Sequence, residues 1–145
     1  MIRILIFAGA YLLTTVTGAA ALGTAALLTD PATPGAVGLA RAGAIAPLTA
    51  SASDWPGVLR AAQDLQADME RVTGRKPAFS TGAVAAAPAV ILIGTVGRSP
   101  LIDGLIKSGK LNADAIRGQW EAFLIETVEQ PLPGVDRALV IAGSD

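Results

Sequence analysis

The stretch 89-AVILIGTVGRSP-100 decides the fold of this 145-residue chain. Ala89–Ile93 are consecutively apolar and rich in β-branched residues, which is typical of a strand covered on both faces. Gly94 and Gly97 then allow a tight loop. The pair Ser99-Pro100 matches the residues preferred at a helix N-cap and at the first helical position, so a helix is predicted to about Lys107. A buried strand that turns directly into a helix indicates an α/β domain.

A longer amphipathic helix is predicted over Asp54–Val72. Asp54 is a suitable N-cap, Pro56 is tolerated in the first turn, and Gly74 and Pro77 end the segment. Apolar residues recur at spacings of three and four, which places them on a single helical face that is expected to pack on the sheet: Val58, Ala62, Leu65, Met69 and Val72.

The remaining elements complete a mixed sheet. Leu39–Thr49 is expected to supply one or two short strands, and Pro47 favours an edge position for them. Asn112–Ile116 predicts a short helix. Trp120–Val128 and Arg137–Ala142 predict an antiparallel hairpin around a turn rich in proline and glycine. The fold class is therefore α/β, a small mixed-sheet layer domain with helices packed on the sheet.

The N-terminus has the pattern of a secretory signal peptide. Arg3 precedes the apolar run Ile4–Val16, and small residues follow, so residues 1–21 are interpreted as a cleaved signal and residues 22–38 as a linker to a domain at 39–145. The alternative is an uncleaved N-terminal membrane anchor, because 26 uncharged residues run from Ile4 to Thr29. Either interpretation predicts export to the periplasm or the extracellular space.

Composition excludes several kinds of site. The chain has no cysteine and no histidine, so neither a disulfide nor a histidine- or cysteine-based zinc site or nucleophile can form within it. The net charge of −1 provides no basic patch for nucleic acid. We expect no metal, no cofactor and no nucleic-acid partner.

The loop Gly94–Pro100 is the strongest candidate for binding, because a helix N-terminus after a glycine loop can accept an anion. It lacks both the G-x-G-x-x-G dinucleotide pattern and the Lys-Ser/Thr pair of a P-loop, which disfavours a nucleotide. Two interpretations stay open. The glycines serve only a tight turn, or Arg98 and the helix N-terminus contact an anion or a sugar.

The carboxylates provide no persuasive acid/base pair. Asp64 and Asp68 lie one turn apart on the polar side of a helix and are interpreted as a solvated face. Glu121 and Glu126 are separated by an odd number of residues, so on a strand they point to opposite faces. Trp120 beside Glu121 suits sugar stacking, with core packing of Trp120 as the alternative.

The ending 138-ALVIAGSD-145 has the form of a buried strand followed by the N-cap of a helix. We therefore expect that the chain is truncated and that further structure follows in the whole protein.

Three segments together resemble one family: 54-DWPGVLRAAQDLQADMERVTGRKP-77, 90-VILIGTVGRSPLIDGLIKSGKL-111 and 118-GQWEAFLIETVEQPLPGVDRALVIAGSD-145. Over about Leu39–Asp145 the chain resembles the N-terminal domain of glycoside hydrolase family 115, the secreted xylan α-1,2-glucuronidases. The resemblance implies a fold similar to the hexosaminidase-like accessory domain that precedes a (β/α)8 barrel. The family releases glucuronic acid or its 4-O-methyl form from xylan with inversion, using carboxylates of the barrel.

What the resemblance implies for this chain is a non-catalytic domain with no catalytic residue of its own. Its partner would be the C-terminal catalytic barrel of the same protein, its substrate glucuronoxylan, and the full-length enzyme a homodimer. Four residues are expected at the edge of the cleft that binds the substrate: Arg98, Trp120, Glu121 and Asp145. The alternative is a free-standing exported module that binds an acidic sugar or another anion.

Overall fold

The computed structural model describes residues 36–41 and 43–145. The expected signal peptide or anchor at residues 1–21, and the linker up to residue 35, lie outside the described residues. No helix in the described ranges is long and apolar enough to cross a membrane. The elements follow in the order β1 (Ala40–Arg41), β2 (Ala44–Ile45), β3 (Leu48–Ala50), α1 (Pro56–Thr73), β4 (Phe79–Ser80), β5 (Ala87–Thr95), α2 (Pro100–Lys107), β6 (Phe123–Glu129) and β7 (Val135–Gly143).

Five strands form a mixed sheet in the order β4-β3-β5-β7-β6, and β1 pairs with β2 in a separate antiparallel ribbon. β3, β4, β5 and β7 are parallel, and only β6 runs antiparallel to its neighbour. The predicted α/β class, the central strand and the antiparallel hairpin of the last two strands are confirmed.

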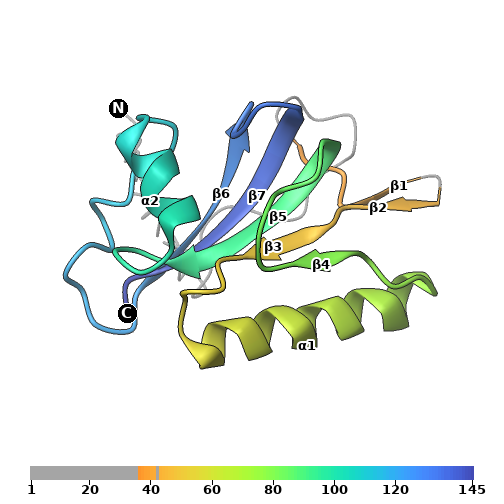
Figure 1. Cartoon of the computed structure of the whole chain (residues 1–145), viewed down its shortest axis with the longest axis horizontal. Coiled ribbons are helices and arrows are strands. Elements are labelled where there is room, and N and C mark those ends of the chain that lie inside the picture. Colours follow the sequence, from red (N-terminus) through yellow and green to blue (C-terminus); the bar gives the residue numbers. More distant parts are fainter. Residues whose placement is uncertain (1–35, 42) are drawn as a thin grey trace, which may run out of the picture.

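The two helices pack on opposite sides of the sheet (Figure 1). Alternate residues of β5 divide between two cores, as the side-chain period of a strand requires. Ile91 and Ile93 join the core under α1, whereas Val90 and Leu92 join the core under α2. Because both sets are buried, β5 is apolar without interruption.

Helix α1 follows its predicted stripe over most of its length. Ala62 is buried, and Val58, Leu65 and Met69 pack against the core. The prediction for Val72 is wrong: its side chain is 86% exposed. Val72 lies in the last turn, and the helix ends directly after it at Gly74, which has a φ of 71° and closes the helix in a left-handed conformation.

Two other local predictions are wrong. Asn112–Ile116 contains no helix, because the Asn112 side chain accepts the Asp114 N–H (2.9 Å) and organises a turn instead. β3 is an inner strand between β4 and β5, although Pro47 favoured an edge. Pro47 lies just before β3, where its missing N–H is not needed, and its carbonyl accepts the Ile91 N–H (2.8 Å).

Neither helix covers the α1 side of β6 and β7. In the register of these strands Ile125 lies opposite Ile141, and Thr127 lies opposite Leu139. Phe123 and Ile125 are 70% and 36% exposed, and Leu139 and Ile141 are half-buried. We refer to Phe123, Ile125, Leu139 and Ile141 as the β6–β7 strip.

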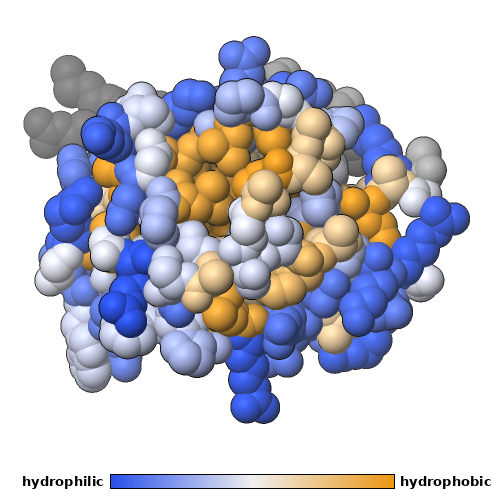
Figure 2. Space-filling model, viewed as in Figure 1, coloured by the Kyte–Doolittle hydropathy of each residue, from blue (hydrophilic) through white to orange (hydrophobic). Residues whose placement is uncertain are grey.

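Figure 2 shows apolar surface in the upper middle of the view, where Figure 1 draws β6 and β7, with hydrophilic residues around it. Several apolar side chains that pack on the α2-side core are only partly buried, among them Leu101, Ile106 and Leu132. The short helix α2 therefore leaves part of the core beneath it accessible to solvent.

The position of β5 leads to a prediction on stability. Replacing Leu92, which is fully buried in the α2-side core, by alanine leaves a cavity and is expected to lower the free energy of unfolding by about 2–5 kcal/mol. The exposed Val72→Ala variant should change it by no more than about 0.5 kcal/mol. Urea denaturation of both variants measures the difference, and equal effects would contradict the central position of β5.

Candidate functional site

The carboxyl ends of β3 and β5 define the candidate site. These strands are neighbours and parallel, but the chain leaves β3 toward α1 on one side of the sheet and leaves β5 toward α2 on the other. In α/β proteins, ligands commonly bind at the carboxyl edge where the connections reverse in this way. The loops are Ser51–Trp55 and Val96–Ser99.

A buried carboxylate joins the two loops. One oxygen of Asp54 (Oδ2) accepts the Thr95 N–H at 2.8 Å, and the other (Oδ1) accepts the Trp55 N–H at 2.8 Å. Asp54 was predicted as the N-cap of the helix; instead Trp55 occupies the cap position, and no side chain caps it. The carboxylate is used to connect β5 to the start of α1, because the Thr95 amide at the end of the strand needs an acceptor.

A close approach of backbone and side chains tightens the second loop. The Ser99 hydroxyl accepts the Ile102 N–H of α2 and lies 2.9 Å from the Ser51 hydroxyl. A Cβ at Gly94 would lie 2.6 Å from the Ser99 Cβ and 2.9 Å from Asp54 Oδ2, so only glycine fits there. The tight-turn interpretation is therefore sufficient for Gly94, and the predicted cap at Ser99 is confirmed.

Arg98 stacks on an aromatic ring where the two loops meet. Its guanidinium carbon lies 3.7 Å from the centroid of the exposed Trp55 ring, which is a cation–π contact. Sequence reasoning missed Trp55, since a tryptophan ahead of a helix carries no signal that it will meet an arginine 43 residues later. One feature of the sequence points to this contact: Trp55 follows β3 and Arg98 follows β5, each within five residues of the end of its strand.

The other three predicted residues form a second corner at the same end of the sheet. The Glu121 N–H donates to the Asp145 carboxylate, at 3.1 Å to Oδ1 and 3.4 Å to Oδ2. The Ser144 hydroxyl accepts the Ala122 N–H (3.1 Å). Trp120 is 81% exposed, so the core-packing interpretation of that residue is wrong.

Glu121 is not part of β6, and the argument about strand faces therefore does not apply to it. It precedes the strand with a φ of 51°, a left-handed conformation in which its amide faces Asp145. Ser144 and Asp145 are thus engaged with the chain entering β6. Hydrogen bonds from backbone amides to the Asp145 and Ser144 side chains hold this corner, rather than charge pairing.

The structure brings all four predicted residues to one edge of the sheet, in two groups. The Val96 N–H donates to the Gly143 carbonyl (2.9 Å) and connects the loop of Arg98 to the end of β7. Within residues 36–41 and 43–145, no hydrogen bond or ion pair joins Arg98 to Trp120, Glu121 or Asp145. The four predicted residues and Trp55 therefore supply one cation, two carboxylates and two exposed indole rings, and the Asp103 carboxylate accepts the Gly97 N–H (2.8 Å) beside Arg98.

Metal binding and acid/base chemistry find little support at this edge. In the part of the chain that the structure describes, no group of three or more histidine, cysteine, aspartate or glutamate side chains could hold a metal ion. Asp64 and Asp68 are exposed on α1, and Asp68 pairs with Arg71. The arrangement at this edge suits binding through a cation and aromatic faces.

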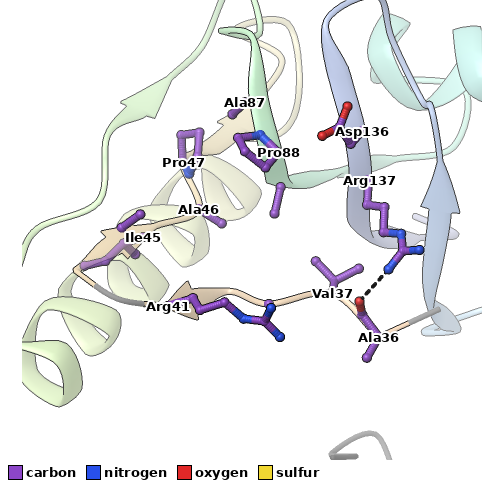
Figure 3. A pocket seen from close by; sticks show the side chains of 13 residues that line it. Ala36, Val37, Arg41, Ile45, Ala46, Pro47, Ala87, Pro88, Asp136 and Arg137 are labelled. Atoms are coloured by element: carbon purple, nitrogen blue, oxygen red, sulfur yellow. Dashed lines mark hydrogen bonds between the residues drawn. The ribbon is translucent and has the colours of Figure 1, made fainter. Parts of the chain in front are cut away.

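A separate hollow of about 620 Å³ lies at the opposite edge, where the parallel strands begin (Figure 3). Alanine and proline side chains form much of its wall, and Arg41 and Arg137 line it. Arg137 donates to the Ala36 carbonyl (2.9 Å) and pairs with Glu129 (3.3 Å). No local sequence pattern marks this hollow, because its residues come from distant segments of the chain.

Comparison with known proteins adds no assignment. A scan against protein-family models finds no match for the chain, and a search of curated proteins finds no relative.

Removing the Asp54 carboxylate tests its role between the two loops. Asp54→Ala leaves the buried Thr95 amide without an acceptor and is expected to reduce the free energy of unfolding by about 1–3 kcal/mol, whereas Asp54→Asn, which keeps one oxygen, should cost less. Asp64→Ala on the exposed side of α1 is the matched control. Thermal and urea unfolding measure the three variants, and a neutral Asp54→Ala would exclude the proposed connection.

Proposed function

We propose that this chain is the non-catalytic N-terminal domain of a secreted xylan α-1,2-glucuronidase, inactive by itself. The sequence resemblance to the accessory domain of glycoside hydrolase family 115 supports the proposal, and a small α/β sheet domain is compatible with it. In this proposal the chain is exported, and the glucuronic acid is released by a catalytic barrel of the same protein.

The observation that carries the proposal is the chemistry of the carboxyl edge. Arg98 presents a guanidinium, the group best matched to a carboxylate, and Trp120 presents an indole face of the kind that stacks on sugar rings. A glucuronic acid branch on xylan combines a carboxylate with a pyranose ring. This edge is therefore suited to contact the decorated polysaccharide next to an active site.

The contacts of Asp54 and Asp145 favour a structural role for these two carboxylates over hydrolysis. An inverting glycosidase needs two carboxyl groups about 6.5–9.5 Å apart that face a common substrate position. Asp54 is buried and accepts two amide hydrogens, and Asp145 accepts the Glu121 N–H. These contacts make Asp54 and Asp145 structural acceptors, which is why we assign catalysis to another part of the protein.

A free-standing binding module is the second candidate. The stack of Arg98 on Trp55 favours it, because the indole orients the guanidinium at the surface without any further domain. The two candidates differ in whether the isolated chain binds an acidic polysaccharide.

The first candidate predicts that the purified chain releases no glucuronic acid from 4-O-methylglucuronoxylan, measured by chromatography of released uronic acids. An active xylan α-glucuronidase assayed in parallel shows that the substrate is competent. Turnover above the no-protein blank would refute the assignment of catalysis to another domain.

The second candidate predicts retarded migration of the chain in gels that contain glucuronoxylan, and no retardation in arabinoxylan gels. Arg98→Ala should abolish the retardation, since the carboxylate loses its cationic partner. Arg60→Ala, which removes an equal charge from the exposed face of α1, should preserve it. Equal migration in both gels would leave the first candidate alone.

A further inference from the structure

Two exposed indole rings lie at the carboxyl edge in different surroundings. Trp55 is 46% exposed and carries the Arg98 guanidinium on its face. Trp120 is more exposed, and among the described residues no other ring or cation contacts it. One indole therefore orients a cation, and the other leaves its face open to a ligand.

A short path of backbone hydrogen bonds connects these two points. The Val96 N–H donates to the Gly143 carbonyl (2.9 Å), and the Ser144 N–H donates to the Ala122 carbonyl (2.9 Å). The loop after β5, the end of β7 and the entry to β6 thus lie in a row at one end of the sheet (Figure 1). From β5 across β7 to β6 is two strand spacings, about 9–10 Å. A short oligosaccharide spans this distance, whereas a single pyranose ring does not.

The Arg98 end can accept a carboxylate. Among the described residues no carboxylate forms an ion pair with Arg98, because Asp103 accepts the Gly97 N–H (2.8 Å) and the buried Asp54 accepts two backbone amides. The indole of Trp55 holds the guanidinium by its face. The edge of the guanidinium, which carries its N–H donors, is left for a coplanar, bidentate contact with a carboxylate of the ligand.

The Trp120 end favours a neutral sugar. Glu121 and Asp145 are both exposed beside this ring. Their carboxylates repel an acidic unit, but they accept hydrogen bonds from sugar hydroxyls. The open indole face suits stacking on a pyranose ring. The charges along the edge therefore determine which part of a ligand lies at which point.

We propose that the carboxyl edge binds one oligosaccharide at two points, with a uronic acid at Arg98 and a neutral pyranose roughly two rings away at Trp120. This inference rests on the proposed contact between this edge and decorated xylan. It adds to that contact the minimum length of the ligand and the position of its single acidic unit.

A series of ligands of increasing length tests the two points. Calorimetry measures the affinity of the full chain for 4-O-methylglucuronic acid, alone and linked to xylobiose, xylotriose or xylotetraose. The affinity is expected to rise roughly two- to tenfold once the ligand spans both points and then to stay level, because one aromatic stack is added. Trp120→Ala, which removes an exposed ring, should abolish the rise. Val72→Ala, at an exposed position of α1, is the matched control and should preserve it.

The chain has two tryptophans, which allows the two points to be observed separately. In Trp55→Phe, which keeps an aromatic face for Arg98, all indole emission comes from Trp120. This emission should change with the spanning ligand but not with the free uronic acid. In Trp120→Phe, the emission of Trp55 should change with both ligands. A response of Trp120 to the free uronic acid would place the acid at the wrong end and overturn the proposal.

Trigalacturonic acid, which has a carboxylate on every unit, tests the charge argument. It should bind less tightly than the spanning xylan fragment, and Glu121→Gln should raise its affinity by roughly two- to fivefold because a like charge is removed. Glu126→Gln makes the same change of charge at an exposed position within β6 and should leave the affinity as it is. Equal effects of the two variants would contradict the assignment of the neutral unit to Trp120.

Failure of this inference is distinguishable from failure of the proposed contact with xylan. Equal affinities for short and long ligands that all depend on Arg98, or a rise that survives Trp120→Ala, would overturn the two-point site and leave the acidic contact in place. If none of the acidic ligands binds, the contact itself is refuted, and the two-point site with it.

Discussion

Burial of β5 on both faces is the constraint on which the rest of the structure depends. A strand with apolar residues at every position from Val90 to Ile93 cannot be satisfied by one layer, so a layer is required on each side. α1 supplies one, and α2 with the segment after it supplies the other. Pairing with β7 along nearly its whole length then makes β5 the element that both cores share.

The position of the candidate site at the carboxyl edge is a consequence of the same constraint. Since consecutive helices cover opposite sides, the chain leaves β3 and β5 toward opposite faces, and the Ser51 and Ser99 hydroxyls meet between the two loops at 2.9 Å. The Asp54 carboxylate connects the same region by accepting the Trp55 N–H and the Thr95 N–H at the end of β5. The charged and aromatic groups that remain, Arg98 on Trp55, are left at the surface. The position of the candidate site is therefore a result of topology, and only its chemistry depends on the side chains.

The sequence predicts those parts of the structure that are determined by residues close together in the chain. The apolar run Ala89–Ile93, the pair Ser99-Pro100 and the turn before β7 carry their structural information within a few residues, and each was predicted correctly. The failures depend on distant partners. Asp54 looked like a helix cap because nothing nearby revealed the Thr95 amide, and Trp120 looked like core because its exposure depends on how β6 begins.

The candidate site shows the same division. Arg98, Trp120, Glu121 and Asp145 were selected by residue type and their neighbours in the chain. The parallel pair β5–β7 ends, and the antiparallel strand β6 begins, at the same edge, which brings them together there. Their grouping into two corners, and the role of Trp55, depend on contacts across more than 20 residues that no short motif encodes.

The two ends of β6 have a consequence for local motion. Glu121 and Gln130, which flank the strand, both have left-handed backbones, with φ values of 51° and 45°, and neither is a glycine. Each conformation costs roughly 1–2 kcal/mol, and β6 has only one neighbour in the sheet with which to offset it. The amides of β6 should therefore exchange with solvent by opening of this strand alone, well below the free energy that opens β5. In this domain the outermost strand is the natural unit of partial unfolding, and covering its apolar face would also lock it to the sheet.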